Sequence, residues 1–415
     1  MELNEDFWKF VTQNKSESPS RLRLKYHGKD MPQWFDSAVR QIECQQKAGV
    51  KFGDLQPRLM LNPLSVEQST SASVARLHAR LIRENIPGTI CRIADLTCGM
   101  GIDLMAMRLA FDCHALGFEL NRTVAEASQW NYADDPMIEI QCADSVDWLE
   151  NYDGASFDLI FVDPARRADD GGRVYAISQC APDVKALLPF LEKHCRFAAV
   201  KLSPMLDVTS VLRDLPQTCR LFVIGNRREC LELFALLDFT EKRQAHELGE
   251  NAPIMIIPDA EAYPLSAFTF SRCDESGTQL PLLFDTPRQG QWLFEPSAAT
   301  MKGAPFALLC HKYNMTALHP NTHLFIADTY HDEAPGRWFR VVKSYPFTAS
   351  TLKNLGKDIG QADVAVRNFP MTADELSRRL KLRPGGTRRL MAVTVKEPAG
   401  DSRHLILLEK ESIKS

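Results

Sequence analysis

Four acidic residues each lie at the end of a segment that reads as a short strand, and the first of them opens a glycine-containing loop. Asp95 begins the sequence Asp-Leu-Thr-Cys-Gly-Met-Gly-Ile-Asp, while Glu119, Asp144 and Asp163 end the next three segments. Glycines let the loop backbone approach a ligand closely, and the N-terminus of a following helix favours negative charge. Glu119 lies 18 residues beyond the second glycine of the loop, where a carboxylate can accept both hydroxyls of an adenosine ribose. Asp144 could then receive the adenine amino group.

The elements that position these acids alternate along the chain from residue 89 onward. This alternation predicts a Rossmann-like, doubly wound α/β sheet, mainly parallel, with helices on both faces. The carboxyl ends of parallel strands meet at one edge of such a sheet, so we expect all four acids to line one crevice. The expected strands are 90–96, 114–119, 138–142, 157–162, 197–202, 220–224 and 254–257, and the expected helices are 101–109, 124–132, 146–149, 184–195 and 229–237.

Residues 90–225 resemble a class I S-adenosylmethionine-dependent methyltransferase. The resemblance rests on the loop after Asp95, on Glu119 and Asp144, and on the segment Phe-Asp-Leu-Ile-Phe-Val-Asp-Pro that ends at Pro164. The form Asp-Leu-Thr-x-Gly-x-Gly-x-Asp is similar to ribosomal RNA guanine methyltransferases. The resemblance implies that Asp163 contacts or deprotonates the methyl acceptor. It also implies that the cofactor is S-adenosylmethionine, held by Asp95, Thr97, Gly99, Gly101, Glu119, Asp144 and Ser145.

Three other segments extend the resemblance to bacterial methyltransferases that carry a C-terminal THUMP-like domain. They are Asp-Pro-Ala-Arg-Arg at 163–167, Val-Lys-Leu-Ser-Pro at 200–204 and Glu-Pro at 295–296. The expected domains are a helical N-terminal region at 1–70, the class I methyltransferase domain at 71–262, a small α+β connecting domain at 263–325 and the THUMP-like basic α+β domain at 326–415.

The same motifs argue against three related chemistries. An NAD dehydrogenase needs a third loop glycine, and Leu104 occupies that position. Amine methyltransferases of nucleic acids usually place an aromatic residue after Asp-Pro-Pro to stack on a flipped base, whereas Ala165 and Arg166 stand here. Pyrimidine C5 methyltransferases need a nucleophilic cysteine after the fifth strand, and Leu202 stands in its place.

Several cations are candidates for binding the substrate. Arg166 and Arg167 suit a phosphate or carboxylate, or they pair with acids of their own loop. Lys201 ends an apolar strand and therefore needs a partner, for which Asp163 is the natural choice.

The C-terminal part of the chain is basic, although the whole chain carries a net charge of −4. Residues 336–396 contain 13 Lys or Arg and four acids, so this segment is +9 and the rest is −13. A basic module favours a polyanion such as RNA, and a solvated face is the alternative. A Pro-Gly-Gly turn within it could bind phosphates through its backbone N–H groups, together with Arg383, Arg388 and Arg389.

Composition and cysteine spacing argue against a membrane protein, a disulfide-bonded protein and a metal-binding protein. The chain has 415 residues, 45% of them hydrophobic and 25% charged, as expected for a globular protein. No apolar stretch is long enough to span a membrane. Eleven cysteines without a Cys-x-x-Cys pair indicate reduced thiols in a cytoplasm. Cys310, His311, His319 and His323 fit ordinary core and surface roles better than a metal site.

The sequence therefore predicts a cytoplasmic S-adenosylmethionine-dependent methyltransferase that acts on a base of structured RNA, tRNA or rRNA. Two alternatives stay open. The first is a methyltransferase for a protein or a small molecule. The second is an RNA-binding protein that keeps the cofactor pocket without catalysis, a possibility that Ala165 and Arg166 in the acceptor motif favour.

Overall fold

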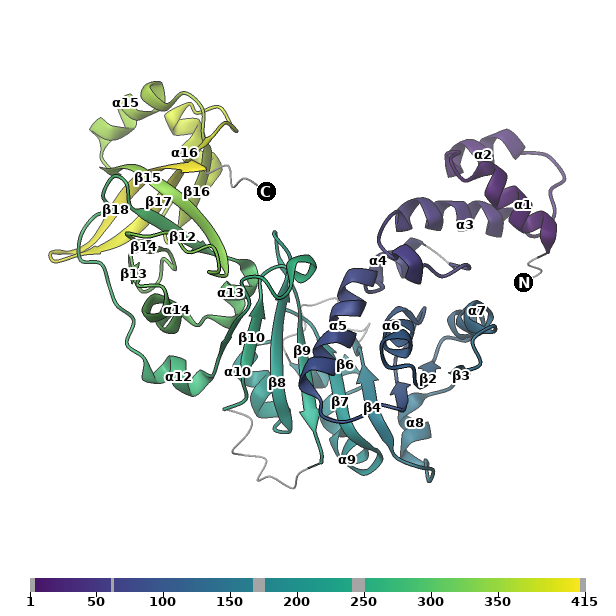
Figure 1. The fold of residues 1–415 in the computed structure, drawn as a ribbon. Coiled ribbons are helices and arrows are strands. Elements are labelled where there is room, and N and C mark those ends of the chain that lie inside the picture. The colour runs from purple at the N-terminus through teal and green to yellow at the C-terminus, as the bar shows by residue number, and fades with distance from the viewer. Residues whose placement is uncertain (1–3, 61–62, 167–175, 241–250, 411–415) are drawn as a thin grey trace. The chain divides into compact units, whose positions relative to one another are not determined.

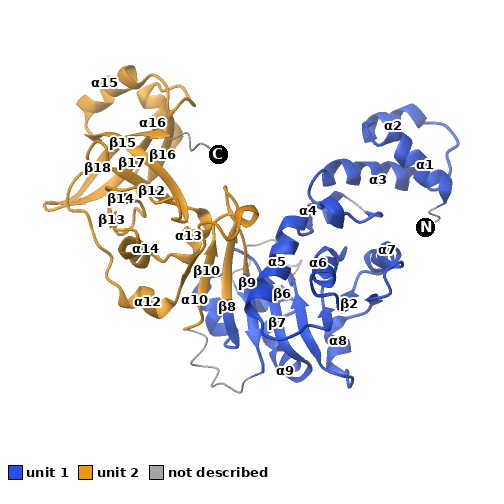
Figure 2. Cartoon of the chain, in the orientation of Figure 1, with its two compact units in different colours: residues 1–220, 234–249 blue, residues 221–233, 250–415 orange. Residues whose placement is uncertain are grey.

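The computed structural model describes residues 4–60, 63–166, 176–240 and 251–410. The chain forms two compact units (Figure 2). Unit 1 comprises residues 1–220 and 234–249, and unit 2 comprises residues 221–233 and 250–415. No helix of the described part is long and apolar enough to cross a membrane.

The N-terminal region is helical, as predicted. Asn4 caps the first helix by accepting the N–H of Phe7 at 3.0 Å, and apolar side chains of the first three helices form one cluster around Phe7, Leu22 and Ile42. The elements are α1 Glu5–Asn14, α2 Pro19–Tyr26, α3 Phe35–Ala48, η1 Gly53–Leu55 and α4 Pro63–Gln68.

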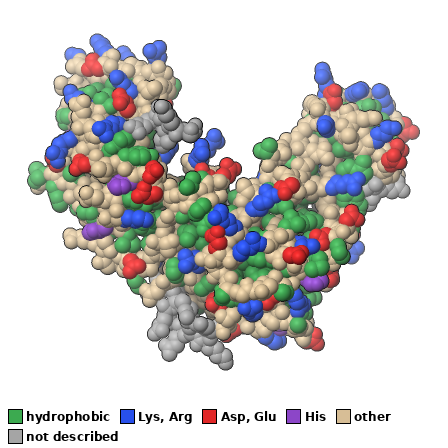
Figure 3. All heavy atoms as spheres, viewed as in Figure 1, with side chains coloured by type: hydrophobic (Ala, Val, Ile, Leu, Met, Phe, Trp, Pro, Cys, Tyr) green, Lys and Arg blue, Asp and Glu red, His purple; other side chains and the backbone are tan. Residues whose placement is uncertain are grey.

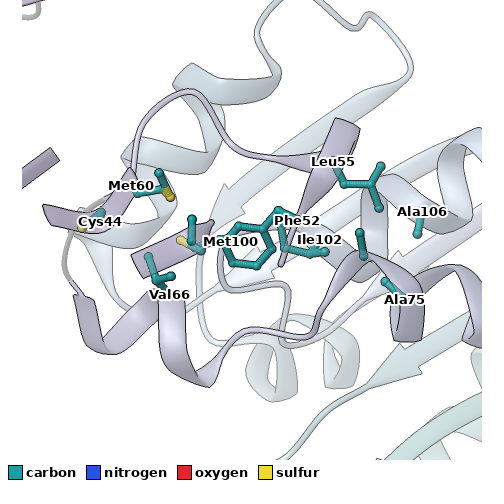
Figure 4. Packing of buried hydrophobic residues seen from close by; sticks show 11 residues of the cluster. Cys44, Phe52, Leu55, Met60, Val66, Ala75, Met100, Ile102 and Ala106 are labelled. Carbon is teal, nitrogen blue, oxygen red and sulfur yellow. The ribbon is translucent and has the colours of Figure 1, made fainter. Parts of the chain in front are cut away.

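This region packs on the rest of unit 1 at two places. Phe52, Met60 and Val66 share a buried cluster with Met100 and Ile102, at the start of the helix that follows the first strand (Figure 4). On the neighbouring helix, the ring of Trp130 stacks on Trp8 with centroids 5.5 Å apart, and the Arg58 guanidinium lies over both rings at 5.0 and 5.2 Å. The N-terminal helices are therefore part of the core of unit 1.

The sheet of unit 1 confirms the predicted α/β fold (Figure 1). Its strands run in the order β9-β7-β4-β1-β2-β3, and β1 pairs in parallel with both β2 and β4. The strand order therefore reverses at β1, which is where open α/β sheets bind ligands. The strands of this sheet are β1 Arg92–Asp95, β2 His114–Glu119, β3 Ile138–Cys142, β4 Phe157–Val162, β7 Cys195–Leu202 and β9 Cys230–Asp238, with β8 Thr218–Gly225 next to β9. β5 Ala165–Arg166 and β6 Cys180–Ala181 form a separate two-stranded sheet.

The helices of unit 1 follow the expected alternation. Ser71 caps α5, which buries Val74, Leu77, Leu81 and Ile82 as their helical spacing predicts. The helices are α5 Ala72–Asn85, α6 Ile102–Phe111, α7 Arg122–Tyr132, α8 Ser145–Glu150, η3 Ile177–Gln179, α9 Val184–His194 and α10 Val208–Asp214.

The predicted helix at 229–237 is wrong, because this segment is the strand β9. Residues 232–237 are all buried, so the segment shows no alternation of polar and apolar residues, and its apolar run fits either element. The turn before this segment makes it a strand, because the Asn226 N–H donates to the Glu229 carbonyl at 2.9 Å. This hydrogen bond closes a hairpin between β8 and β9, so the two strands are antiparallel.

Unit 2 is an α+β unit with a sheet of its own. That seven-stranded sheet has the order β13-β14-β12-β15-β18-β17-β16, and unit 2 also holds β10 and β11, which continue from β8. Near the C-terminus the chain forms a strand, a helix and two further strands, β16, α16, β17 and β18, and α15 precedes them. The elements are β10 Ile254–Ile257, η4 Ala260–Ala262, β11 Phe268–Phe270, α12 Arg272–Gly277, β12 Trp292–Pro296, α13 Ala298–Gly303, α14 Phe306–Lys312, β13 Thr316–Ala317, β14 Phe325–Ala327, β15 Gly336–Pro346, α15 Ala349–Ile359, β16 Asp363–Arg367, α16 Ala373–Leu380, β17 Arg388–Glu397 and β18 Gly400–Lys410.

Candidate active site

The loop after β1 ties the ends of two neighbouring strands together. Asp95 is 1% exposed, and its Oδ1 accepts the Thr97 N–H at 2.9 Å and the Thr97 hydroxyl at 3.3 Å. The Thr97 Oγ1 in turn accepts the N–H of Asp163, at the end of β4, at 2.7 Å. Burial raises the pKa of Asp95 well above its usual value, and the negative charges of Asp103 and Asp163 raise it further. This edge of the sheet is therefore rich in closely spaced carboxyl groups.

Two glycines shape the backbone of the same loop. Gly99 and Gly101 both have positive φ, at +54° and +76°, a conformation that L side chains rarely adopt. A Cβ at Gly101 would also lie 2.5 Å from the ring of Tyr132 on α7, whereas a Cβ at Gly99 would meet nothing within 4 Å. The Ser128 hydroxyl donates to the Gly99 carbonyl at 2.8 Å. The loop is thus held from behind by α7 and is open at Gly99, as a cradle for a ligand requires.

The next two acids lie at the carboxyl ends of β2 and β3, beside this loop. Glu119 is half-buried, and its Oε1 accepts the Asn121 N–H at 2.7 Å. Asp144 is exposed and caps α8, since its Oδ1 accepts the Val146 N–H at 2.8 Å. Ser145 is buried as the first residue of α8. The structure thus brings the predicted cofactor residues to one edge of the sheet, although Asp144 also has the structural role of a helix cap.

Asp163 forms the ion pair that the sequence predicts. The Lys201 ammonium, on β7, donates to Asp163 Oδ2 at 2.6 Å and to the Thr70 hydroxyl at 3.1 Å. The Lys201 side chain is 17% exposed and that of Asp163 is 36% exposed. Asp163 therefore presents a fixed, partly accessible carboxylate beside the cradle.

A second buried pair, which the sequence reasoning missed, lies behind Lys201. His78 on α5 is fully buried, stacks on Phe234 with centroids 4.4 Å apart, and pairs through Nδ1 with Asp103 Oδ1 at 2.8 Å. Burial raises the pKa of Asp103, but the hydrogen bond from His78 and the charges of His78 and Lys201 outweigh burial and leave it lowered. Asp103 also accepts a hydrogen bond from Thr70.

Thr70 thus joins the two pairs. The chain His78–Asp103–Thr70–Lys201–Asp163 runs from the core of unit 1 to the crevice. The available signal in the sequence is the position of His78, a polar residue at helical spacing among the buried apolar positions of α5.

The remaining predicted substrate residues lie elsewhere. Arg166 is the second residue of β5, and Arg167 lies outside the described residues. In unit 2, Arg383 is exposed and Arg388 half-buried, whereas Arg389 is paired with the buried Glu295 at 3.1 Å.

The Pro-Gly-Gly turn was predicted to offer its backbone N–H groups to phosphates, and the structure gives one of them a partner within the protein. The Gly385 N–H does not face a ligand, because it donates to Asp363 Oδ1 at 2.7 Å. Lys410 contacts both Asp363 and the Gly386 carbonyl. These contacts hold the turn against β16 and β18.

The cysteine and histidines considered for a metal have separate surroundings. His311 contacts the Gln279 carbonyl at 3.0 Å, His319 contacts Asp401 at 3.3 Å, and His323 stacks on Phe306. Burial raises the pKa of the Cys310 thiol to about 12. Among the residues that the structure describes, no three His, Cys, Asp or Glu side chains are grouped as a metal ion would need.

Two family models match the C-terminal part of the chain. Residues 292–335 match a ferredoxin-like domain. Residues 336–410 match a THUMP domain-like family. Both matched segments contribute strands to the seven-stranded sheet of unit 2.

Longer similarities cover both units. Proteins from two strains of Mycobacterium tuberculosis, CDC 1551 / Oshkosh and H37Rv, are each 26% identical over 375 residues, which is 87% of this chain and 92% of theirs. Each bears the name of an uncharacterized S-adenosylmethionine-dependent methyltransferase. A crystal structure from Porphyromonas gingivalis W83, assigned as a methyltransferase, matches with a TM-score of 0.85 and 28% identity. The match covers 99% of this chain and 100% of that one.

Proposed function

We propose that this chain, an S-adenosylmethionine-dependent methyltransferase with a THUMP-like domain, methylates a base of structured RNA, either tRNA or rRNA. The enzyme class and the cofactor, both predicted from the motifs, are confirmed by the similarity to methyltransferases over nearly the whole chain. The observation that carries the RNA proposal is the match of residues 336–410 to the THUMP-like family, a class linked to RNA binding.

The crevice at β1 fits the cofactor. Its residues offer what an adenosine-bearing sulfonium needs: an open backbone cradle at Gly99, the half-buried carboxylate of Glu119 for the ribose, and Asp144 beside the adenine position. Asp95 is buried at the start of the same loop, where it accepts hydrogen bonds from the Thr97 N–H and hydroxyl and so fixes the backbone of the cradle. We propose that these residues, with Thr97, Gly101 and Ser145, hold S-adenosylmethionine, which supplies a methyl group from its sulfonium.

Asp163 is then the residue that handles the acceptor. Its carboxylate would accept a hydrogen bond from the N–H or O–H of the acceptor and take that proton, while the cofactor would supply the methyl group by cleavage of its sulfur–methyl bond. Lys201 and Thr70 fix the orientation of this carboxylate, and positioning of this kind is a main source of rate in a displacement reaction.

Unit 2 supplies cations for the RNA. Figure 3 shows Lys and Arg side chains, interspersed with Asp and Glu, over the face of unit 2 that it presents. Of the predicted residues, Arg383 and Arg388 are accessible for backbone phosphates. In unit 1, Arg166 and Arg167 follow the acceptor motif and stay candidates for binding the substrate.

The assay that tests the proposed function uses S-adenosylmethionine labelled in its methyl group. Incubation with total RNA, protein and metabolite fractions should transfer label into RNA above all. The Asp163→Asn variant serves as the control, because a label that it transfers equally well does not come from this site. Label in protein or metabolites alone would instead support the alternative acceptors, and no label in any fraction would favour a non-catalytic RNA-binding protein.

Cofactor affinity should fall when Glu119 is replaced by Ala. The loss of charge-assisted hydrogen bonds to the ribose hydroxyls should weaken binding by about 1.5–3 kcal/mol, which calorimetric titration measures. Glu126→Ala, at an exposed position on α7, is the matched control and should leave the affinity unchanged. Equal affinities for the folded Glu119→Ala variant and the wild type would exclude this placement of the ribose.

A further inference from the structure

Glu295 is a buried carboxylate that the methyl-transfer site does not use. It lies on β12 in unit 2 with 2% of its surface exposed. Three guanidinium groups contact it: Arg337 at 2.9 Å through Oε2, and Arg389 and Arg367 at 3.1 and 3.5 Å through Oε1. We call Arg337, Arg367 and Arg389 the arginine cluster.

The arginine cluster is assembled by the sheet of unit 2. Arg337 lies directly opposite Glu295 on β15, whereas Arg389 and Arg367 come from β17 and β16. In a flat sheet, β12 and β16 would be about 19 Å apart, since neighbouring strands lie about 4.8 Å apart. The sheet must therefore curve for these side chains to meet, which makes the cluster a property of the fold.

The cluster carries more positive charge than Glu295 neutralises. Three guanidiniums and one carboxylate leave an excess of two charges. Asp363 also acts on Arg389, but its oxygens are held by Lys410 and the Gly385 N–H. Adding the Asp363–Lys410 pair to the count leaves the excess at two. Burial lowers the pKa of Arg389, and the charges of Arg337 and Arg367 lower it further against the opposing effect of Glu295.

Two members of the cluster can reach a ligand. The Arg337 side chain is 60% exposed and that of Arg367 is 39% exposed, compared with 16% for Arg389. Arg389 has a buried Nε with no hydrogen-bond partner in the described part of the chain. The buried carboxylate of Glu295 requires partners, and Arg389 together with one of the other two arginines would be enough to pair it. A third arginine at the same place is explained if the cluster also binds an anion from outside the protein.

We propose that the arginine cluster, organised by Glu295, is a phosphate-binding site that holds a backbone phosphate of the RNA substrate. A guanidinium fork matches two phosphate oxygens at once, and one phosphate would offset part of the excess charge. The assignment of the bound phosphate to RNA rests on the proposed function. The binding of a phosphate by the arginine cluster does not. In this arrangement Arg389 holds Glu295 in place, while Arg337 and Arg367 touch the ligand.

Salt-dependent binding of unfractionated tRNA to the full-length protein tests the RNA part. Each phosphate contact contributes about 0.7–0.9 to the log–log slope. Because Arg337 and Arg367 hold one phosphate together, the Arg337→Gln/Arg367→Gln variant should lower the slope by roughly 0.7–0.9. The control variant, Arg227→Gln/Arg403→Gln, removes two exposed arginines of unit 2 outside the cluster and should keep the wild-type slope. A slope in the cluster variant equal to that of the control would overturn the assignment to RNA.

Thermal unfolding with tripolyphosphate tests the site independently of RNA. At constant ionic strength, tripolyphosphate should raise the Tm of the wild type and of the control variant, and not that of the Arg337→Gln/Arg367→Gln variant. Glu295→Gln raises the excess charge to three, so its Tm should start lower and rise more with tripolyphosphate than the wild-type Tm. A Tm response in the double variant equal to that of the wild type would overturn the site. A cluster-dependent response in a protein that does not bind tRNA would keep the site and reject the RNA proposal.

Discussion

Replacing Asp163 by Asn is expected to slow methyl transfer by at least about 100-fold, as removal of a positioned acid or base does. Asn keeps the shape of the side chain but cannot take the acceptor proton. Cofactor affinity should change little, because the bond from this position to the cofactor loop is the Asp163 main-chain N–H to Thr97. Single-turnover rates on the fraction that accepts the label measure the first effect, and calorimetric titration measures the second.

Asp158→Asn is the matched control for this experiment. Asp158 lies near the opposite end of the same strand, where it accepts the Cys91 N–H at 2.7 Å and pairs with Arg196 at 3.0 Å. Its replacement should affect stability and leave the rate per folded molecule within a few-fold of wild type. Rates for Asp163→Asn that match those of the control would mean that Asp163 serves the fold through Lys201 and is not part of the chemistry.

Replacing Asp103 by Ala should lower the free energy of unfolding by about 3–5 kcal/mol, the usual effect of removing one partner from a buried pair. The change leaves the fully buried His78 without its carboxylate partner and removes the acceptor of the Thr70 hydroxyl. Urea unfolding followed by circular dichroism measures it. The control is Glu67→Ala, which breaks an exposed pair with Lys47 and should cost no more than about 1 kcal/mol. Equal losses in the two variants would refute the importance of the buried pair.

The contribution of Asp103 to the free energy of unfolding should also decrease as the pH falls. Its pKa is lower in the folded protein than the usual value of 3.8, so the folded state favours the charged carboxylate. The resulting stability is fully present above the unfolded pKa and is lost as pH falls through the folded pKa. The stability gap between wild type and Asp103→Asn should therefore be largest near neutral pH and shrink below about pH 4. A gap that widens on acidification would contradict this sign.

The fold could be predicted wherever sequence pattern and local geometry agree. The strands β2, β3, β4 and β10 have the predicted bounds. β2, β4 and β10 are mainly apolar, and β3 alternates apolar and polar residues. β9 could not be recognised from periodicity, since a strand buried on both faces has none. The turn residue Asn226, which accepts the N–H groups of Arg228 and Glu229, is the signal that separates this strand from a helix.

Only some contacts of the candidate site could be predicted, because the others join residues that are far apart in the sequence. The pairing of Lys201 with Asp163 follows from the need of a buried lysine for a partner. The contribution of Thr70 does not, because it lies 131 residues from Lys201 and comes from the region before α5. Arg389 was assigned to the substrate by its basic surroundings, and the structure pairs it with Glu295, 94 residues away. Contacts over such separations depend on the assembled sheet and leave no trace in local sequence.

The stack of Trp8 and Trp130 gives the enzyme an optical signature of its own assembly. Two indole rings at 5.5 Å are close enough to couple electronically, so near-ultraviolet circular dichroism carries a signal from this pair. The rings belong to α1 and α7, and α7 also carries Ser128 and Tyr132, which hold the backbone of the cofactor loop from behind. The near-ultraviolet circular dichroism of Trp8 and Trp130 therefore reports whether the N-terminal helices are packed against α7, the helix that also supports the cofactor loop. No added label is needed.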